Sequence, residues 1–136
     1  MLPGMPDLLV PISPGELIDK ITILEIKSQR MTDAAKLHNV RTELSLLRDT
    51  WQASPFAAID VSAEWAALRD VNGKLWDIED HIRDKERAGL FDAGFIELAR
   101  AVYVTNDERA AIKKKINTKL GSALVEEKSY AAYRKD

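Results

Sequence analysis

The sequence has no cysteine and only two histidines among its 136 residues. The absence of cysteine excludes disulfides, thiolate metal sites and cysteine nucleophiles, and it suits a reducing compartment. Two histidines are too few for most histidine-based metal sites, and no Glu-x-x-His pair of the kind found in di-iron helical bundles is present. We therefore predict no metal, no cofactor and no catalytic residue.

A long hydrophobic run is missing as well. The apolar stretch at residues 8–12 is short, and no lysine or arginine precedes it. A signal peptide needs a basic start and about 7–15 apolar residues, and a membrane helix needs about 20. The sequence thus predicts a cytoplasmic protein without a membrane partner.

An excess of positive charge is also lacking. Lysine and arginine number 20 against 22 aspartates and glutamates, a net charge of −2. Nucleic-acid binders usually carry a clear basic excess, so we do not expect a nucleic-acid partner. What the sequence does have is 46% hydrophobic and 31% charged residues, a composition typical of helical bundles and coiled coils.

Hydrophobic residues recur three and four positions apart along most of the chain, which is the spacing of one face of an α-helix. Each of four such segments follows a residue that can cap a helix. The expected N-caps are Ser13, Thr32, Ser62 and Asp92. Glycines at 89 and 121 are the expected stops of the third and fourth helices.

These helices predict an all-α fold, an elongated antiparallel bundle of two long helical hairpins. The single domain, residues 1–136, divides into an extended segment (1–12), a first hairpin (13–53), a second hairpin (62–121) and a tail (122–136) that forms an arm or a short helix. The helices of the second hairpin are each roughly 40 Å long at 1.5 Å per residue. Such a slim bundle, which carries three tryptophans, does not bury all its apolar surface alone. We therefore expect a homo-oligomer, most simply a dimer.

Polar residues interrupt the apolar seam of the second hairpin. Thr105 and Arg109 fall at seam positions, and a turn near residues 90–91 brings Asn72 close to Arg109. One interpretation is a polar layer that fixes the register of the helices. The other is a ligand-binding pocket in which Arg109 and Lys113 hold an anion and Asn72 orients it, with Glu79 as a further candidate.

Charge is distributed unevenly along the same hairpin. Residues 77–86 contain five acids and two bases, and residues 109–119 contain five cations and no acid. Carboxylates spaced along one helical face can hold magnesium, but the facing stretch 95–104 offers only Glu97, so we favour a solvated face. The basic stretch either complements the dipole of its helix or meets a phosphate, a nucleotide or an acidic partner.

Four strings carry a resemblance to a known family. They are Ser13–Lys27, Leu75–Asp80, Ala101–Asp107 and Gly121–Tyr130. With them the chain resembles, over residues 11–134, a bacterial family described only as a domain of unknown function. The resemblance implies a setting among genes for surface-polysaccharide and glycosyltransferase proteins, and it implies no catalytic residues.

No glycine-rich phosphate loop, nucleophile elbow or zincin motif occurs in the sequence. The sequence therefore favours a non-enzymatic helical interaction or accessory protein that presents residues 109–119 and the tail to a partner, with a link to surface-glycan assembly implied by the resemblance. The alternative is a small α-helical enzyme or binder that acts on an anionic metabolite such as a nucleotide, a sugar nucleotide or a phosphate.

Overall fold

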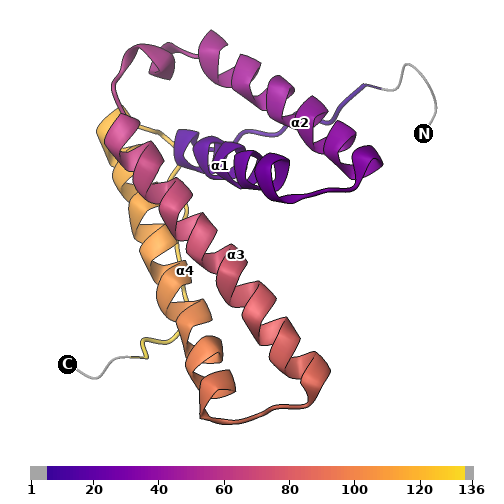
Figure 1. Cartoon of the computed structure of the whole chain (residues 1–136). Coiled ribbons are helices and arrows are strands. Elements are labelled where there is room, and N and C mark those ends of the chain that lie inside the picture. Colours follow the sequence, from indigo (N-terminus) through magenta and orange to yellow (C-terminus); the bar gives the residue numbers. More distant parts are fainter. Residues whose placement is uncertain (1–5, 134–136) are drawn as a thin grey trace.

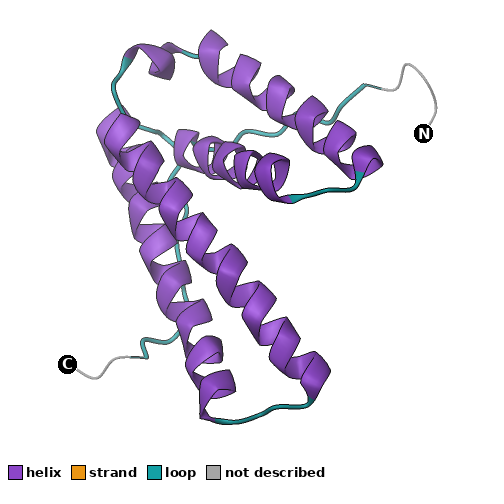
Figure 2. Ribbon diagram, in the orientation of Figure 1, coloured by secondary structure: helices purple, strands orange, loops and turns teal. Residues whose placement is uncertain are grey.

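The structure, a computed structural model, describes residues 6–133, and within them the chain is helical without any strand. The elements are α1 (Pro14–Arg30), α2 (Ala34–Ala53), a short 3-10 helix η1 (Pro55–Ala58), α3 (Ser62–Ala88) and α4 (Ala93–Leu120). Figure 2 shows these helices joined by short loops. The all-α prediction is confirmed, and α3 and α4, with 27 and 28 residues, are as long as expected.

The helix ends follow the predicted capping chemistry at four positions. Ser13 and Asp92 each accept a hydrogen bond from the backbone N–H three residues further on, at 3.1 Å and 3.0 Å. Gly89 and Gly121 adopt φ angles of 66° and 65°, the left-handed conformation that only glycine reaches at little cost. These residues therefore set the ends of α1, α3 and α4.

Two predicted N-caps are wrong. The cap of α2 is Asp33, whose carboxylate accepts the N–H of Lys36 at 2.9 Å, rather than Thr32. A carboxylate at this position also interacts favourably with the positive end of the helix dipole. Ser62 is the first residue of α3 rather than its cap, because both its N–H and its hydroxyl donate to Asp60.

The helices form two antiparallel pairs, α1 with α2 and α3 with α4. Helix α1 contacts all three others, and the α1–α2 pair crosses one end of the α3–α4 pair (Figure 1). The opposite end of the α3–α4 pair extends away from α1 and α2 (Figure 1). This arrangement divides the molecule into two regions.

The first region, which we call the base, comprises α1, α2, η1, residues 61–72 and residues 105–120. It contains the hydrophobic core, to which all four helices contribute. The buried core side chains are Leu17, Ile18, Ile21, Leu24, Val40, Leu44, Trp51, Val61, Leu68, Ile116 and Leu120. Burying an aliphatic side chain of this kind contributes about 1.5–3 kcal/mol, so the base holds most of the stabilising burial.

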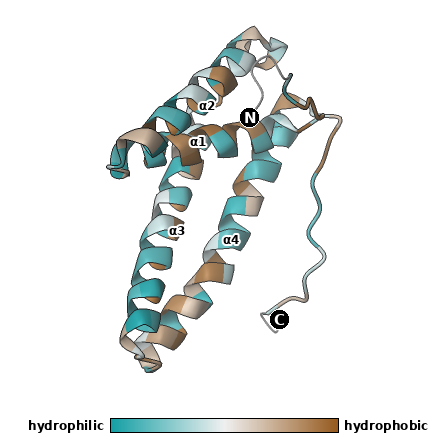
Figure 3. Cartoon of the chain, turned by 90° about the vertical axis from the view of Figure 1, so that its right-hand side faces the viewer, coloured by the Kyte–Doolittle hydropathy of each residue, from teal (hydrophilic) through white to brown (hydrophobic). Residues whose placement is uncertain are grey.

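The second region, the projection, is the remainder of the α3–α4 hairpin, residues 73–104. No residue of the projection is buried. Its seam side chains, such as Leu75, Ile82 and Leu98, are only half-buried between the two helices. Hydrophobic residues nevertheless continue along α4 into the projection (Figure 3).

The tail has no helix in its described part, residues 122–133, so it is an arm there. It runs alongside α4 toward the projection (Figure 3). Lys128 forms an ion pair with Asp107 of α4, and the ring of Tyr133 lies 4.9 Å from that of Tyr103, centroid to centroid. The predicted extended segment and the predicted tail also include residues 1–5 and 134–136, which lie outside the described residues.

Candidate functional site

A cluster of charged and polar side chains lies where α1 meets α3 and α4. At its centre is the carboxylate of Asp19, which is 1% exposed. Its Oδ1 accepts hydrogen bonds from Asn72 and from Nε of Arg109, both at 2.9 Å. Its Oδ2 accepts a second bond from the guanidinium of Arg109. One carboxylate on α1 therefore ties together a residue of α3 and a residue of α4.

Close contact between the start of α1 and the end of α4 positions this cluster. The backbone N–H of Gly15 donates to Oδ1 of Asn117 at 2.8 Å. A Cβ atom at residue 15 would lie 2.7 Å from the carbonyl oxygen of Lys113, closer than real Cβ contacts allow. Glycine is required here because the two backbones approach one another directly.

Lys113 extends the cluster toward the surface. Its ammonium group lies 2.6 Å from Glu16, 2.8 Å from Glu126 of the tail and 3.9 Å from Asp19. Burial by itself would lower the pKa of Lys113, but its hydrogen bonds to Glu126 and Glu16 outweigh burial and raise the pKa above its usual value. The hydrogen bond from Lys113 lowers the pKa of Glu126.

The pairing of charges limits what this cluster can do chemically. Arg109 makes a bidentate bond with Asp19, which raises the pKa of the guanidinium further and holds its fork in one orientation. Two cations, Arg109 and Lys113, face three carboxylates, those of Asp19, Glu16 and Glu126. The interior side of the cluster thus has its charges compensated, as a layer that fixes helix register requires.

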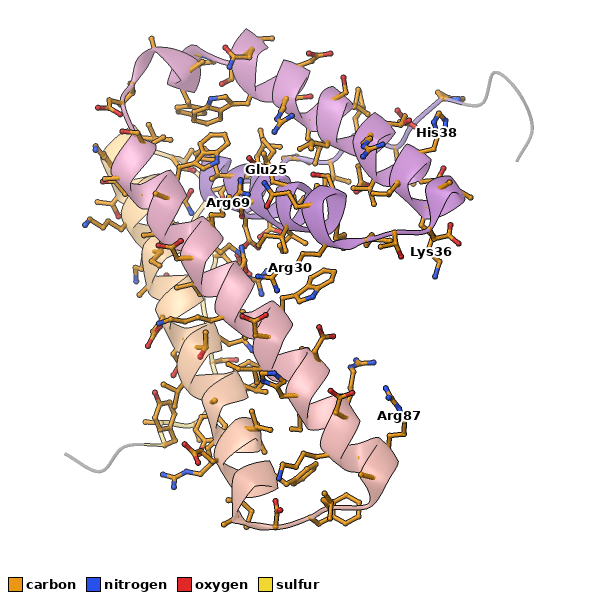
Figure 4. All side chains as sticks on the ribbon, viewed as in Figure 1. Glu25, Arg30, Lys36, His38, Arg69 and Arg87 are labelled. Atoms are coloured by element: carbon orange, nitrogen blue, oxygen red, sulfur yellow. The ribbon has the colours of Figure 1, made fainter. Side chains whose placement is uncertain are left out.

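A second polar cluster lies where α1 passes α2 and α3. Glu25 accepts hydrogen bonds from Arg69 at 2.9 Å, from the indole of Trp65 at 3.3 Å and from Arg48 at 3.4 Å. Figure 4 shows Glu25 and Arg69 facing one another beneath α2. The ring of Trp51 meets that of Trp65 edge to face at 5.5 Å. This cluster joins three helices and has a donor for each oxygen of Glu25.

The structure brings three of the four predicted ligand-binding residues together. Asn72, Arg109 and Lys113 all lie within the Asp19 cluster. Glu79 does not, since it is an exposed residue of the projection that pairs with Arg83 on its own helix at 3.1 Å. The cluster is therefore smaller along the hairpin axis than the predicted pocket.

The sequence interpretation missed the residue at the centre of the cluster. Asp19 follows Leu17 and Ile18 in a helix whose hydrophobic residues cover most of its circumference. A helix packed on several sides leaves few solvated positions, and that was a signal that Asp19 is buried. Glu126 gave no such signal, because the tail has no periodic pattern that places it against α4.

Two further classes of site, metal centres and membrane-spanning helices, are absent from residues 6–133. No group of three or more histidine, aspartate or glutamate side chains there is arranged to hold a metal ion. No helix in that range has the length and hydrophobicity required to cross a membrane.

Comparison with known proteins gives one match. A family model described as a family of unknown function, DUF6165, matches residues 8–134. No curated protein and no solved structure matches the chain significantly.

Proposed function

We propose that this chain, which belongs to the DUF6165 family of unknown function, is a non-enzymatic helical interaction module whose projection pairs with a second copy of itself. The observation that carries the proposal is the contrast between continuous hydrophobic seams and the lack of any buried residue from 73 to 104. Two helices cover one side of each seam, and a third or fourth helix is needed to cover the other.

Exposed hydrophobic side chains near the turn of the projection support the proposal. Phe91 is 60% exposed, Ile96 57% and Leu90 51%. Single exposed hydrophobic residues are ordinary, but a cluster of them beside an uncovered seam is typical of an interaction surface.

The total accessible surface is large enough for such an interface. It is 9762 Å², whereas a compact monomer of 15.3 kDa has about 7,100 Å². A stable dimer covers about 800 Å² on each partner. The excess, to which the exposed N-terminal segment, the tail and the projection all contribute, is larger than that area.

The distribution of charge favours a second copy in antiparallel orientation. The acidic stretch 77–86 lies in the projection, and the basic stretch 109–119 lies in the base. Lys114 and Lys115 of that basic stretch are exposed, and neither forms an ion pair within the described residues. Antiparallel pairing about a two-fold axis brings the acidic stretch of each copy toward the basic stretch of the other.

The cellular role that we propose is accessory to surface-glycan assembly in the cytoplasm of a bacterium. The resemblance of four sequence strings to a family with that genomic setting supports the role, and the absence of cysteine supports the compartment. The lack of an open catalytic constellation in the Asp19 cluster supports a non-enzymatic function.

Size-exclusion chromatography with light scattering tests the proposal. We expect the chain to elute with twice its mass of 15.3 kDa and Ile96→Asp to shift it toward the monomer. Leu46→Asp is the matched control, because Leu46 is 52% exposed but lies on α2 in the base. A monomeric mass for the unmodified chain at all concentrations contradicts the proposal, as does equal dissociation by both substitutions.

A further inference from the structure

A cavity of about 1000 Å³ lies between α4 and the tail. Its size falls within the range of small-molecule sites, roughly 300–1,000 Å³. We call this cavity the tail groove. The residues that line it include Tyr103, Asn106, Lys114, Lys128, Tyr130 and Tyr133.

Positive charge predominates in the lining of the tail groove. Four cationic side chains line it, those of Arg109 and Lys113 from the Asp19 cluster and those of Lys114 and Lys128. Two carboxylates, those of Asp107 and Glu126, oppose them. Arg109 and Lys113 are already paired with carboxylates of the Asp19 cluster, and Lys128 is paired with Asp107. Lys114 is the lining cation that forms no ion pair within the described residues.

Aromatic rings lie beside these cations. The rings of Tyr103 and Tyr133 are tilted 57° to one another with centroids 4.9 Å apart. The ammonium group of Lys128 lies 5.9 Å from the centroid of Tyr130, whose side chain is 88% exposed. A ring face next to a cation is the combination that binds flat or ring-shaped groups with an attached negative charge.

One anionic group already occupies part of the groove. The carboxylate of Glu126 lies 2.8 Å from the ammonium group of Lys113, although the side chain of Glu126 is 62% exposed and that of Lys113 only 11%. The ammonium group of Lys113 therefore already binds an anionic group on its groove side, and that group belongs to a solvent-exposed side chain. A phosphate offers more charge and more acceptor oxygens than a carboxylate at the same position.

We propose that the tail groove is a binding site for a small molecule that carries a phosphate attached to a ring, such as a sugar phosphate or a nucleotide. The phosphate replaces Glu126 at Lys113, where Lys114 and Lys128 flank it, and the ring rests against the tyrosines. Two residues of the anion site predicted from the sequence, Arg109 and Lys113, also line the tail groove. This proposal does not depend on self-association.

Isothermal titration calorimetry at low salt tests it with pyrophosphate, glucose 1-phosphate and ADP. We expect at least one ring-bearing ligand to bind about tenfold more tightly than pyrophosphate, because stacking on an aromatic side chain contributes a factor of that order. A preference between glucose 1-phosphate and ADP identifies the sugar or the nucleotide as the natural class.

Substitutions at exposed positions assign the contacts without disturbing the core. Glu126→Gln removes the internal competitor and should tighten binding about fivefold, the value of an exposed ion pair. Lys114→Gln should weaken binding of all ligands, whereas Lys115→Gln, the adjacent exposed lysine outside the groove, should not. Tyr130→Ala should weaken the ring-bearing ligands and leave pyrophosphate unchanged.

Three results would overturn the proposal. The first is a lack of binding of all three ligands, at millimolar concentration, to both the unmodified chain and Glu126→Gln. The second is weaker binding after Glu126→Gln. The third is an equal effect of Lys114→Gln and Lys115→Gln, which would show attraction to general positive charge rather than a site. Light scattering on the same samples separates these outcomes from a failure of the dimer.

Discussion

The base and the projection have the same hydrophobic pattern and different burial. Leu68 on α3 is completely buried in the core that all four helices share, whereas Leu75, two helical turns further along the same seam, is only half-buried. The two residues differ in what lies opposite them rather than in their local sequence. A helical seam therefore indicates which face of a helix is hydrophobic, and tertiary structure decides whether that face is covered.

The base and the projection also differ in the sequence separation of their ion pairs. In the base, ionic contacts such as Asp19–Arg109 and Glu25–Arg69 connect different helices across long sequence separations. In the projection, the ion pairs Arg83–Glu79 and Lys85–Asp92 join residues close in sequence. Arg30 of α1 reaches Asp77 of α3 at 2.6 Å, close to the boundary between the two regions.

Substitutions of Asp19 in the base and of Asp77 in the projection should differ most in how much they lower the free energy of unfolding. Asp19→Ala leaves the partly buried Arg109 without its carboxylate, and we expect a loss of about 3–5 kcal/mol in the free energy of unfolding. Asp77→Ala, which removes an exposed ion pair with Arg30, should cost less than about 1 kcal/mol. Urea denaturation measures both, and equal losses would show that the Asp19 cluster does not organise the base.

Truncation of a seam leucine in the base and of one in the projection should give the next largest difference in the free energy of unfolding. Leu68→Ala creates a cavity in the core and should cost about 2–5 kcal/mol. Leu98→Ala, at a half-buried seam position of the projection, should cost no more than half as much in the monomer. Urea denaturation at low protein concentration checks this prediction, and a larger loss at Leu98 would contradict the division into two regions.

Replacement of two glycines by alanine should change the stability of the protein in opposite directions. Gly15→Ala places a Cβ 2.7 Å from a backbone oxygen of α4, and overpacking of this kind costs about 1–3 kcal/mol. Gly73→Ala, in the middle of α3, meets nothing closer than 3.8 Å, and it should stabilise the protein by about 0.4–1 kcal/mol. Melting temperatures of both variants test the signs, and a stabilising Gly15→Ala would refute the close approach of α1 and α4.

Acid should release the tail with the smallest effect on stability. Lys113 lowers the pKa of Glu126, so this pair stabilises the folded state above the ordinary glutamate pKa of about 4.3 and is lost as the pH falls through the lower folded value. Amide NMR relaxation of residues 122–133 should show increased motion at that point, while the base remains folded. Tail motion that does not change across this pH range would contradict the contact.

The sequence predicted local features of the structure, but it did not predict how the helices cross one another. The helix lengths, two N-caps and both glycine stops follow from hydrogen-bond chemistry within a few residues, and the hairpin turn predicted that Asn72 and Arg109 are neighbours. The carboxylate that joins them comes from α1, and its position depends on how one helical pair crosses another. The contact of Glu126 with Lys113 likewise depends on the path of a tail without periodic pattern.

Hydrogen exchange measured by mass spectrometry over a wide range of protein concentration tests the central claim most directly. If the projection pairs with a second copy, exchange in residues 73–104 slows as concentration rises, while exchange around Ile18 and Leu68 stays the same. Exchange in the projection that is equally fast at every concentration would contradict the account, because its hydrophobic seam would then remain uncovered in solution.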